Sequence, residues 1–178
     1  MFSITRPRAV ASAAALVGVL VAATGAGGAV AAAPHTGERL VVRGDATVVD
    51  GPCAAGACRL ELSGGAFRGT AGSGAYRGTL TLRLAEAFAN GEGGVCAPVD
   101  GRVVLGAGSP DRLVLAVAGA SCQDGAGPVT AASFTGLARF TVTRAAGKHA
   151  GATGHGVATF LEDAADHDRM TLIGRLSR

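Results

Sequence analysis

Apolar and polar residues alternate along four separate segments of the chain. Leu80, Leu82 and Leu84 alternate with threonine and arginine, and Phe140 and Val142 alternate in the same way. Because successive side chains of a β-strand point to opposite faces, this pattern predicts strands that pack one face inward and expose the other to solvent. The four segments are 60–63, 79–84, 139–143 and 169–176.

Glycine-rich stretches separate these segments from four further apolar ones, and no helical apolar stripe follows residue 31. About eight short strands joined by tight turns favour an all-β fold, which we predict to be a closed antiparallel barrel of about eight strands. Periodicity alone does not distinguish a barrel from a two-sheet β-sandwich, so the sandwich is the alternative. The four further segments are 40–49, 99–105, 112–117 and 157–161.

The first 31 residues have the pattern of a secretion signal. Arg6 and Arg8 provide a positive start, residues 9–23 form an uncharged apolar run, and Ala29-Val30-Ala31 is an A-x-A cleavage site. We therefore predict cleavage after Ala31, which leaves residues 32–178 as a single secreted, extracellular domain. Retention of the uncleaved run as a membrane anchor is the minor alternative.

The distribution of charged and apolar residues argues against a nucleic-acid partner and against a membrane span. The chain carries 16 Lys and Arg against 13 Asp and Glu, and two of the arginines belong to the predicted signal. Lys148 is the single lysine, and no cluster of Lys and Arg forms the basic face that nucleic acids require. No stretch after the signal approaches the roughly 18 apolar residues of a membrane span. We expect no nucleic-acid partner and no stable membrane span.

All four cysteines follow the signal, so they are expected to oxidise outside the cytoplasm. Four cysteines allow three pairings. Cys96 precedes the predicted strand 99–105 and Cys122 follows the predicted strand 112–117, so a hairpin of these strands places both at its open end. The other two cysteines flank one short turn, and their C-x4-C spacing does not match zinc sites. The predicted disulfides are Cys53–Cys58 and Cys96–Cys122.

Two glycine-rich stretches, 63–74 and 144–156, share a pattern in which small residues lead into an alternating strand. The second resembles the G-T-G-x-F-x-G-A-x-G turn of small secreted bacterial barrels, which are similar in shape to allene oxide cyclases and dirigent proteins, the calycin-like group. The resemblance implies an eight-stranded barrel whose tight turn depends on glycine. This chain departs from the pattern, with Ala145-Ala146 in place of Gly-Thr and His149 in place of Phe. No catalytic residue of that group is carried over.

The densest group of polar residues connects the predicted strands 157–161 and 169–176. Its carboxylates, Glu162 among them, and its imidazole are ligand types that could hold a divalent cation. The calcium-loop spacing D-x-[DN]-x-[DN]-G is absent, and we favour a solvated hairpin loop whose charges discourage edge pairing. We therefore predict no metal and no cofactor. The four candidate ligands are Asp163, Asp166, His167 and Asp168.

Two histidines and one tyrosine are the other candidates for chemistry. His149 and His155 could act as a general base or as ligands together with His167, but we favour exposed turn histidines. Tyr76 could direct its hydroxyl into a barrel mouth, although the commoner arrangement is a tyrosine at the edge of the core with its hydroxyl in water.

The sequence contains no G-x-S-x-G, P-loop or H-E-x-x-H motif, so we predict no catalytic or cofactor-binding residue. We expect a non-catalytic extracellular binding or structural module, whose small-residue interior favours space for a small apolar ligand. One alternative is an isomerase- or cyclase-like barrel enzyme, by analogy of fold. Another is a secreted inhibitor that meets another extracellular protein.

Overall fold

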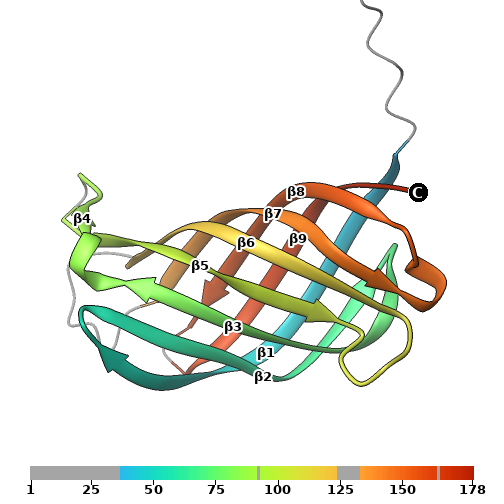
Figure 1. Ribbon diagram of the computed structural model, residues 1–178. Helices are drawn as coiled ribbons and strands as arrows, with labels where there is room; N and C mark the ends of the chain where they lie inside the picture. Colours follow the sequence, from blue (N-terminus) through green and yellow to red (C-terminus); the bar gives the residue numbers. More distant parts are fainter. Residues whose placement is uncertain (1–36, 92, 124–132, 164) are drawn as a thin grey trace, which may run out of the picture. The chain divides into compact units, whose positions relative to one another are not determined.

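The computed structural model describes residues 37–91, 93–123, 133–163 and 165–178, and it forms one antiparallel sheet of nine strands (Figure 1). The predicted signal and its cleavage after Ala31 lie outside the described residues. Within the described ranges, no helix has the length and apolar character needed to cross a membrane. The strands are β1 (Glu38–Ala54), β2 (Ala57–Gly69), β3 (Gly72–Arg83), β4 (Phe88–Ala89), β5 (Val95–Leu105), β6 (Arg112–Gln123), β7 (Phe134–Ala146), β8 (Thr153–Glu162) and β9 (His167–Ser177).

The sheet closes on itself as an eight-stranded antiparallel barrel, with β4 outside it. The strand order is β3-β2-β1-β9-β8-β7-β6-β5-β4, and pairing between β3 and β5 completes the ring. The closing register runs from Tyr76 opposite Leu105 to Leu82 opposite Val99. The predicted barrel is therefore confirmed, and the sandwich alternative is wrong.

The strands are longer than the apolar segments that predicted them, because the glycine-rich stretches continue the sheet. Gly65 pairs with Tyr76 across β2 and β3, and Gly154 pairs with Leu176 across β8 and β9. The glycine-rich stretches were expected to be turns, but only the short connections within them are turns and the remainder is β-strand. Short connections remain at residues 70–71 and around the 3-10 turn η3 (Gly147–His149).

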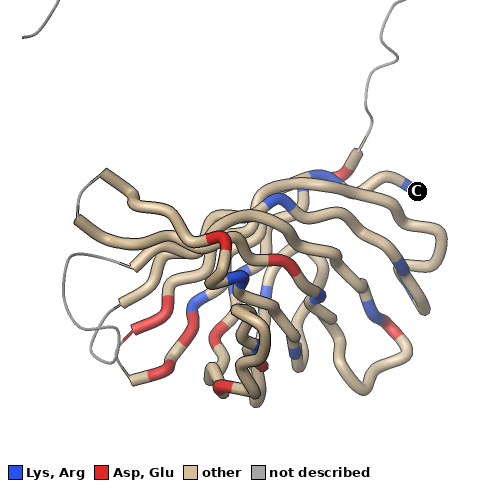
Figure 2. Tube along the Cα trace, turned by 60° about the vertical axis from the view of Figure 1, so that its left-hand side comes forward, with Lys and Arg blue, Asp and Glu red and all other residues tan. Residues whose placement is uncertain are grey.

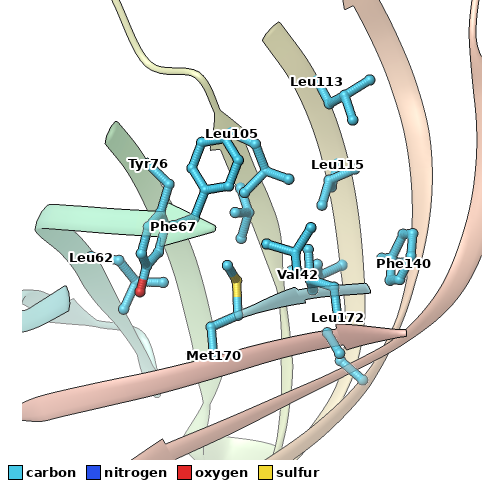
Figure 3. Close-up of a cluster of buried hydrophobic side chains, with 14 of the residues drawn as sticks. Val42, Leu62, Phe67, Tyr76, Leu105, Leu113, Leu115, Phe140, Met170 and Leu172 are labelled. Atoms are coloured by element: carbon cyan, nitrogen blue, oxygen red, sulfur yellow. The ribbon is translucent and has the colours of Figure 1, made fainter. Parts of the chain in front are cut away.

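The rings of Tyr76 and Phe140 lie among the buried side chains of the barrel (Figure 3), and each packs against glycines of the neighbouring strands. A Cβ atom added to Gly65 would lie 2.6 Å from the ring of Tyr76, and one added to Gly44 would lie 2.7 Å from it. Phe140 covers Gly156 in the same way, at 2.7 Å. The small residues of the interior therefore make room for the chain's own rings, in the manner of aromatic side chains that compensate for strand glycines.

Both disulfides lie at the same end of the barrel, which we call the disulfide end. They join Cys53 with Cys58 and Cys96 with Cys122, as predicted, and no cysteine of the described residues is free. In each case the two cysteines face each other across neighbouring antiparallel strands. The hairpin between β8 and β9 lies at this end too, whereas η3 and the last strand residue, Ser177, lie at the opposite end (Figure 1).

Candidate functional site

A small cavity lies inside the barrel at the disulfide end. Its volume is about 30 Å³, and three polar side chains, Ser121, Glu162 and Asp168, line it. The rest of its lining is apolar except for one glycine. The apolar side chains are Val48, Leu60, Leu62, Leu80, Val99, Phe134 and Phe160.

The β8–β9 hairpin places the two carboxylates in this cavity. Glu162 and Asp168 face each other as a cross-strand pair, the last pair before the turn. Asp168 is in phase with the buried residues Met170 and Leu172 of the same strand, so the period-two alternation points it inward. The residue is 2% exposed, and its Oδ2 atom has no hydrogen-bond partner in the part of the chain that the structure describes. Glu162 is half-buried beside it.

Burial and like charge make both carboxylates weak acids. Burial, followed by the negative charges of Glu162 and Asp45, raises the pKa of Asp168 to about 7. Burial, followed by the charges of Asp166, Asp50 and Asp163, raises the pKa of Glu162 to about 7. No ion pair among the described residues includes either group. Both carboxyls therefore change protonation near neutral pH, and the charge of Glu162 makes ionisation of Asp168 harder.

Tyr76 brings a further polar group into the interior. The residue is 1% exposed, and its hydroxyl has no hydrogen-bond partner within the described ranges. The ring reaches across the core so that its oxygen lies toward Leu62, which also lines the cavity (Figure 3). Burial, and then the charges of Asp168 and Asp45, raise the pKa of the phenol, so the hydroxyl stays neutral. The expectation of a hydroxyl in water is wrong, because Gly44 and Gly65 admit the ring to the core.

The other acidic candidates build the hairpin turn on the outside of the barrel. The Oδ1 atom of Asp163 accepts hydrogen bonds from the backbone N–H groups of Ala165 (2.9 Å) and His167 (3.2 Å), which lower its pKa. Its Oδ2 atom lies 3.9 Å from Nδ1 of the exposed His167. Asp166 is exposed and has a left-handed φ of 59°. Asp168 faces the interior instead, so alternation separates it from these three.

The part of the chain that the structure describes holds no group of three or more His, Cys, Asp or Glu side chains able to bind a metal ion. An outer depression of about 640 Å³ nevertheless borders the hairpin, lined by Asp45, Asp163, His167 and Arg169. Asp168 lines this depression as well as the inner cavity. Acidic residues gather at this end of the barrel (Figure 2). Asp168 therefore lies between an acidic outer surface and an apolar interior.

The histidines do not converge. His149 is 6% exposed, so the expectation of an exposed turn histidine is wrong for it, whereas His155 is exposed as expected. Burial, and then the charges of Lys148 and Arg178, lower the pKa of His149 despite a hydrogen bond to the backbone of Ala71. Both histidines lie at the end of the barrel opposite to His167. They cannot form a common site with it.

A second feature of the disulfide end is an exposed apolar segment that leads into and out of β4. Leu84 is 47% exposed, and Phe88 and Val95 are each 50% exposed. Phe88 pairs with Cys96, so one disulfide anchors this segment to the barrel. Exposed apolar side chains in one segment are typical of surfaces that meet other molecules.

Comparison of the chain with protein-family models, with curated proteins and with solved structures gives no significant match. The closed eight-stranded antiparallel barrel is compatible with a calycin-like fold. Two disulfides are consistent with an extracellular protein. The barrel fold alone does not define a function, which depends on the residues of its sites.

Proposed function

We propose that the protein is a secreted, extracellular, non-catalytic binding module of the calycin-like kind, which takes a small, largely apolar molecule at the disulfide end of its barrel. The observation that carries this proposal is a cavity with apolar walls that is lined by Asp168, whose buried Oδ2 atom has no hydrogen-bond partner among the described residues. Apolar walls with a few convergent polar groups are typical of small-molecule sites. A buried polar atom without a partner is unfavourable until a ligand or water satisfies it.

The size of the cavity limits what enters it. A volume of about 30 Å³ is enough for a group the size of a water molecule, which needs roughly 10–15 Å³. One small group of the ligand therefore enters the cavity, and the apolar remainder lies against the half-buried side chains of Leu60 and Phe134 at its edge. This arrangement supports recognition of one end of a molecule rather than its complete enclosure.

Native mass spectrometry of the secreted, unreduced protein tests this proposal. The expected spectrum shows cleavage after Ala31, two disulfides, and an added mass that leaves on mild activation. Ser121 lines the cavity, so Ser121→Leu should fill it and abolish the added mass. Ser73→Leu makes the same change at an exposed position of the opposite end and should retain it. Protein that stays empty after exposure to lipid and metabolite extracts would contradict the proposal.

Acid–base catalysis of an isomerase or cyclase kind is the second candidate. It is favoured by two carboxylates with pKa values of about 7, because a general acid or base works best near the ambient pH. If the protein is such an enzyme, a captured ligand should change into an isomer over time, and Asp168→Asn should stop this change in whatever ligand the variant still captures. Recovery of the ligand unchanged by chromatography supports the binding module instead.

Recognition of another extracellular protein, including inhibition of a secreted protease, is the third candidate. It is favoured by the exposed side chains of Leu84, Phe88 and Val95 beside a disulfide. Inhibition of extracellular proteases by the native protein, and its loss in Phe88→Ser, would support this role. Equal inhibition by the two proteins would place the contact elsewhere.

A further inference from the structure

We infer that the group entering the cavity is a primary ammonium, so that the ligand is a small apolar amine. This inference rests on the proposed binding function and deepens it. It is carried by the geometry of the cavity, which joins a water-sized space, apolar walls and a buried, unpartnered carboxylate oxygen of Asp168.

The charges around the cavity favour a cation. Glu162 from β8 and Asp168 from β9 line it, while Asp45 and Asp50 from β1 and Asp166 from the hairpin add their fields from outside. Tyr76 from β3 contributes a neutral hydroxyl. Among the described residues, no cationic side chain lines the cavity, and Arg169 and His167 belong to the outer depression. A positive group brought by a ligand would compensate the negative charge that the two carboxyls carry once they are ionised.

The size and hydrogen-bonding capacity of an ammonium match the polar groups. An ammonium is close to a water molecule in size and donates three hydrogen bonds. The carboxylates of Asp168 and Glu162 can accept such bonds, and Ser121, whose hydroxyl can also accept one, is a further lining residue. Charge-assisted hydrogen bonds to carboxylates are stronger than neutral ones. The hydrocarbon chain of the amine then lies along the apolar walls, where a second charged group would be unfavourable.

Two other classes of ligand fit less well. Hard divalent cations take six or more oxygen ligands, whereas apolar side chains form most of this lining. A carboxylate or phosphate group would meet the negative charges of Asp168 and Glu162. An uncharged alcohol fits the space but leaves the charge of the pair uncompensated. These comparisons make the ammonium the best match.

The protonation of the carboxylate pair makes the inference pH-dependent. Since the pKa of each carboxyl is about 7, a protonated pair at lower pH has to release a proton before it accepts an ammonium. As the pH rises toward the pKa, the affinity for an amine should therefore increase about tenfold per pH unit for each proton that binding displaces. Above the pKa, the affinity should level off. Affinity for an alcohol of the same length should change little over this range.

Isothermal titration calorimetry with hexylamine, 1-hexanol and hexanoate tests the inference on the full secreted protein. Hexylamine should bind roughly tenfold or more tightly than hexanol, with hexanoate weaker still. Binding at pH 6.5 should release protons, so the measured enthalpy should depend on the ionisation enthalpy of the buffer. Asp168→Asn and Glu162→Gln should each lower hexylamine affinity by about tenfold or more. Glu61→Gln removes a carboxylate from the exposed outer face and should leave the affinity unchanged.

Each contrary result has a distinct meaning. If hexanol binds as tightly as hexylamine, the amine inference fails while the proposed apolar-ligand function stands. If none of the three binds and native mass spectrometry also finds empty protein, both fail. If hexylamine binds but Asp168→Asn and Glu162→Gln leave its affinity unchanged, the cavity is not the site. Tighter binding of an Nα-acetylated lysine amide than of hexylamine would overturn the assignment to an apolar amine and point to a lysine side chain of a partner protein.

Discussion

At the scale of single residues, two glycines determine where the one tyrosine of the chain lies. A Cβ atom at Gly65 would come within 2.6 Å of the Tyr76 ring, closer than real contacts allow. We expect Gly65→Ala to lower the free energy of unfolding by about 1–3 kcal/mol, because overpacking forces the ring or the backbone to move. Urea denaturation measures this change.

A double-mutant cycle provides the control for Gly65→Ala. If contact with the ring is the cause, the cost should become much smaller when Tyr76→Leu is already present, because leucine lacks the rigid ring. Additive effects of the two substitutions would show that alanine disturbs the backbone of β2 instead. In that case, the proposal that Gly65 leaves space for the ring would be wrong.

The buried hydroxyl of Tyr76 should lower the stability of the protein when no ligand is bound. It is buried without a hydrogen-bond partner, and such a group costs about 1–3 kcal/mol. Tyr76→Phe keeps the ring over Gly44 and removes the unsatisfied hydroxyl, so we expect the empty protein to become more stable by about 1 kcal/mol. Thermal unfolding of the two proteins without ligand tests this, and a loss of stability would mean that a bound water satisfies the hydroxyl.

At the scale of elements, both disulfides hold the disulfide end, but they constrain the unfolded chain to different degrees. Cys96 and Cys122 are 26 residues apart in sequence, and Cys53 and Cys58 are 5 apart. Loop-closure entropy predicts about 3.5 kcal/mol for the longer loop and about 2 kcal/mol for the shorter one. We therefore expect replacement of Cys96 and Cys122 by alanine to destabilise more than replacement of the other pair, as measured by urea denaturation.

The reverse order of stability would argue against the entropic explanation. It would indicate that the Cys53–Cys58 bond holds the β1–β2 hairpin in its native form, which the sequence separation does not reflect. Retention of the proposed ligand by each alanine pair can be measured in the same samples, since the cavity lies at this end of the barrel.

The strand pattern could be predicted from the sequence because alternation and turn residues are local properties. The pairing of the cysteines followed from the same strands. The inward position of Asp168 was predictable in principle, since Met170 and Leu172 fix the phase of β9. It was missed because a run of charged residues was interpreted as a solvated loop, whereas the strand already begins at His167.

Other features depend on contacts between distant strands and leave no local signal. The burial of Tyr76 requires Gly44 and Gly65 to lie on the two neighbouring strands, β1 and β2, which only the completed barrel provides. The burial of His149 depends on how η3 meets the chain near Ala71. The size of the cavity likewise depends on how far side chains from opposite walls reach across the barrel.

At the scale of the whole molecule, the buried carboxylate pair should link folding to pH. The pKa of Asp168 is about 7 in the folded protein and about 3.8 ordinarily, so between these values the folded chain holds a proton that the unfolded chain releases. Stability therefore falls as pH rises through this window and levels off above pH 7. Glu162 acts in the same direction. His149 acts oppositely just below pH 6.5, because its folded pKa is lowered.

The comparison of wild type with Asp168→Asn isolates the carboxylate from the histidine. Asparagine cannot ionise, so the variant should gain stability relative to wild type as pH rises from 5 to 8. One pKa unit corresponds to about 1.4 kcal/mol, which moves the melting temperature by roughly 3–5 °C in a protein of this size. Melting curves at several pH values measure the difference, with Glu61→Gln as the control for loss of an exposed carboxylate. Parallel curves for wild type and Asp168→Asn would mean that Asp168 titrates in the folded barrel as it does in the unfolded chain, which its burial and unpartnered oxygen should prevent.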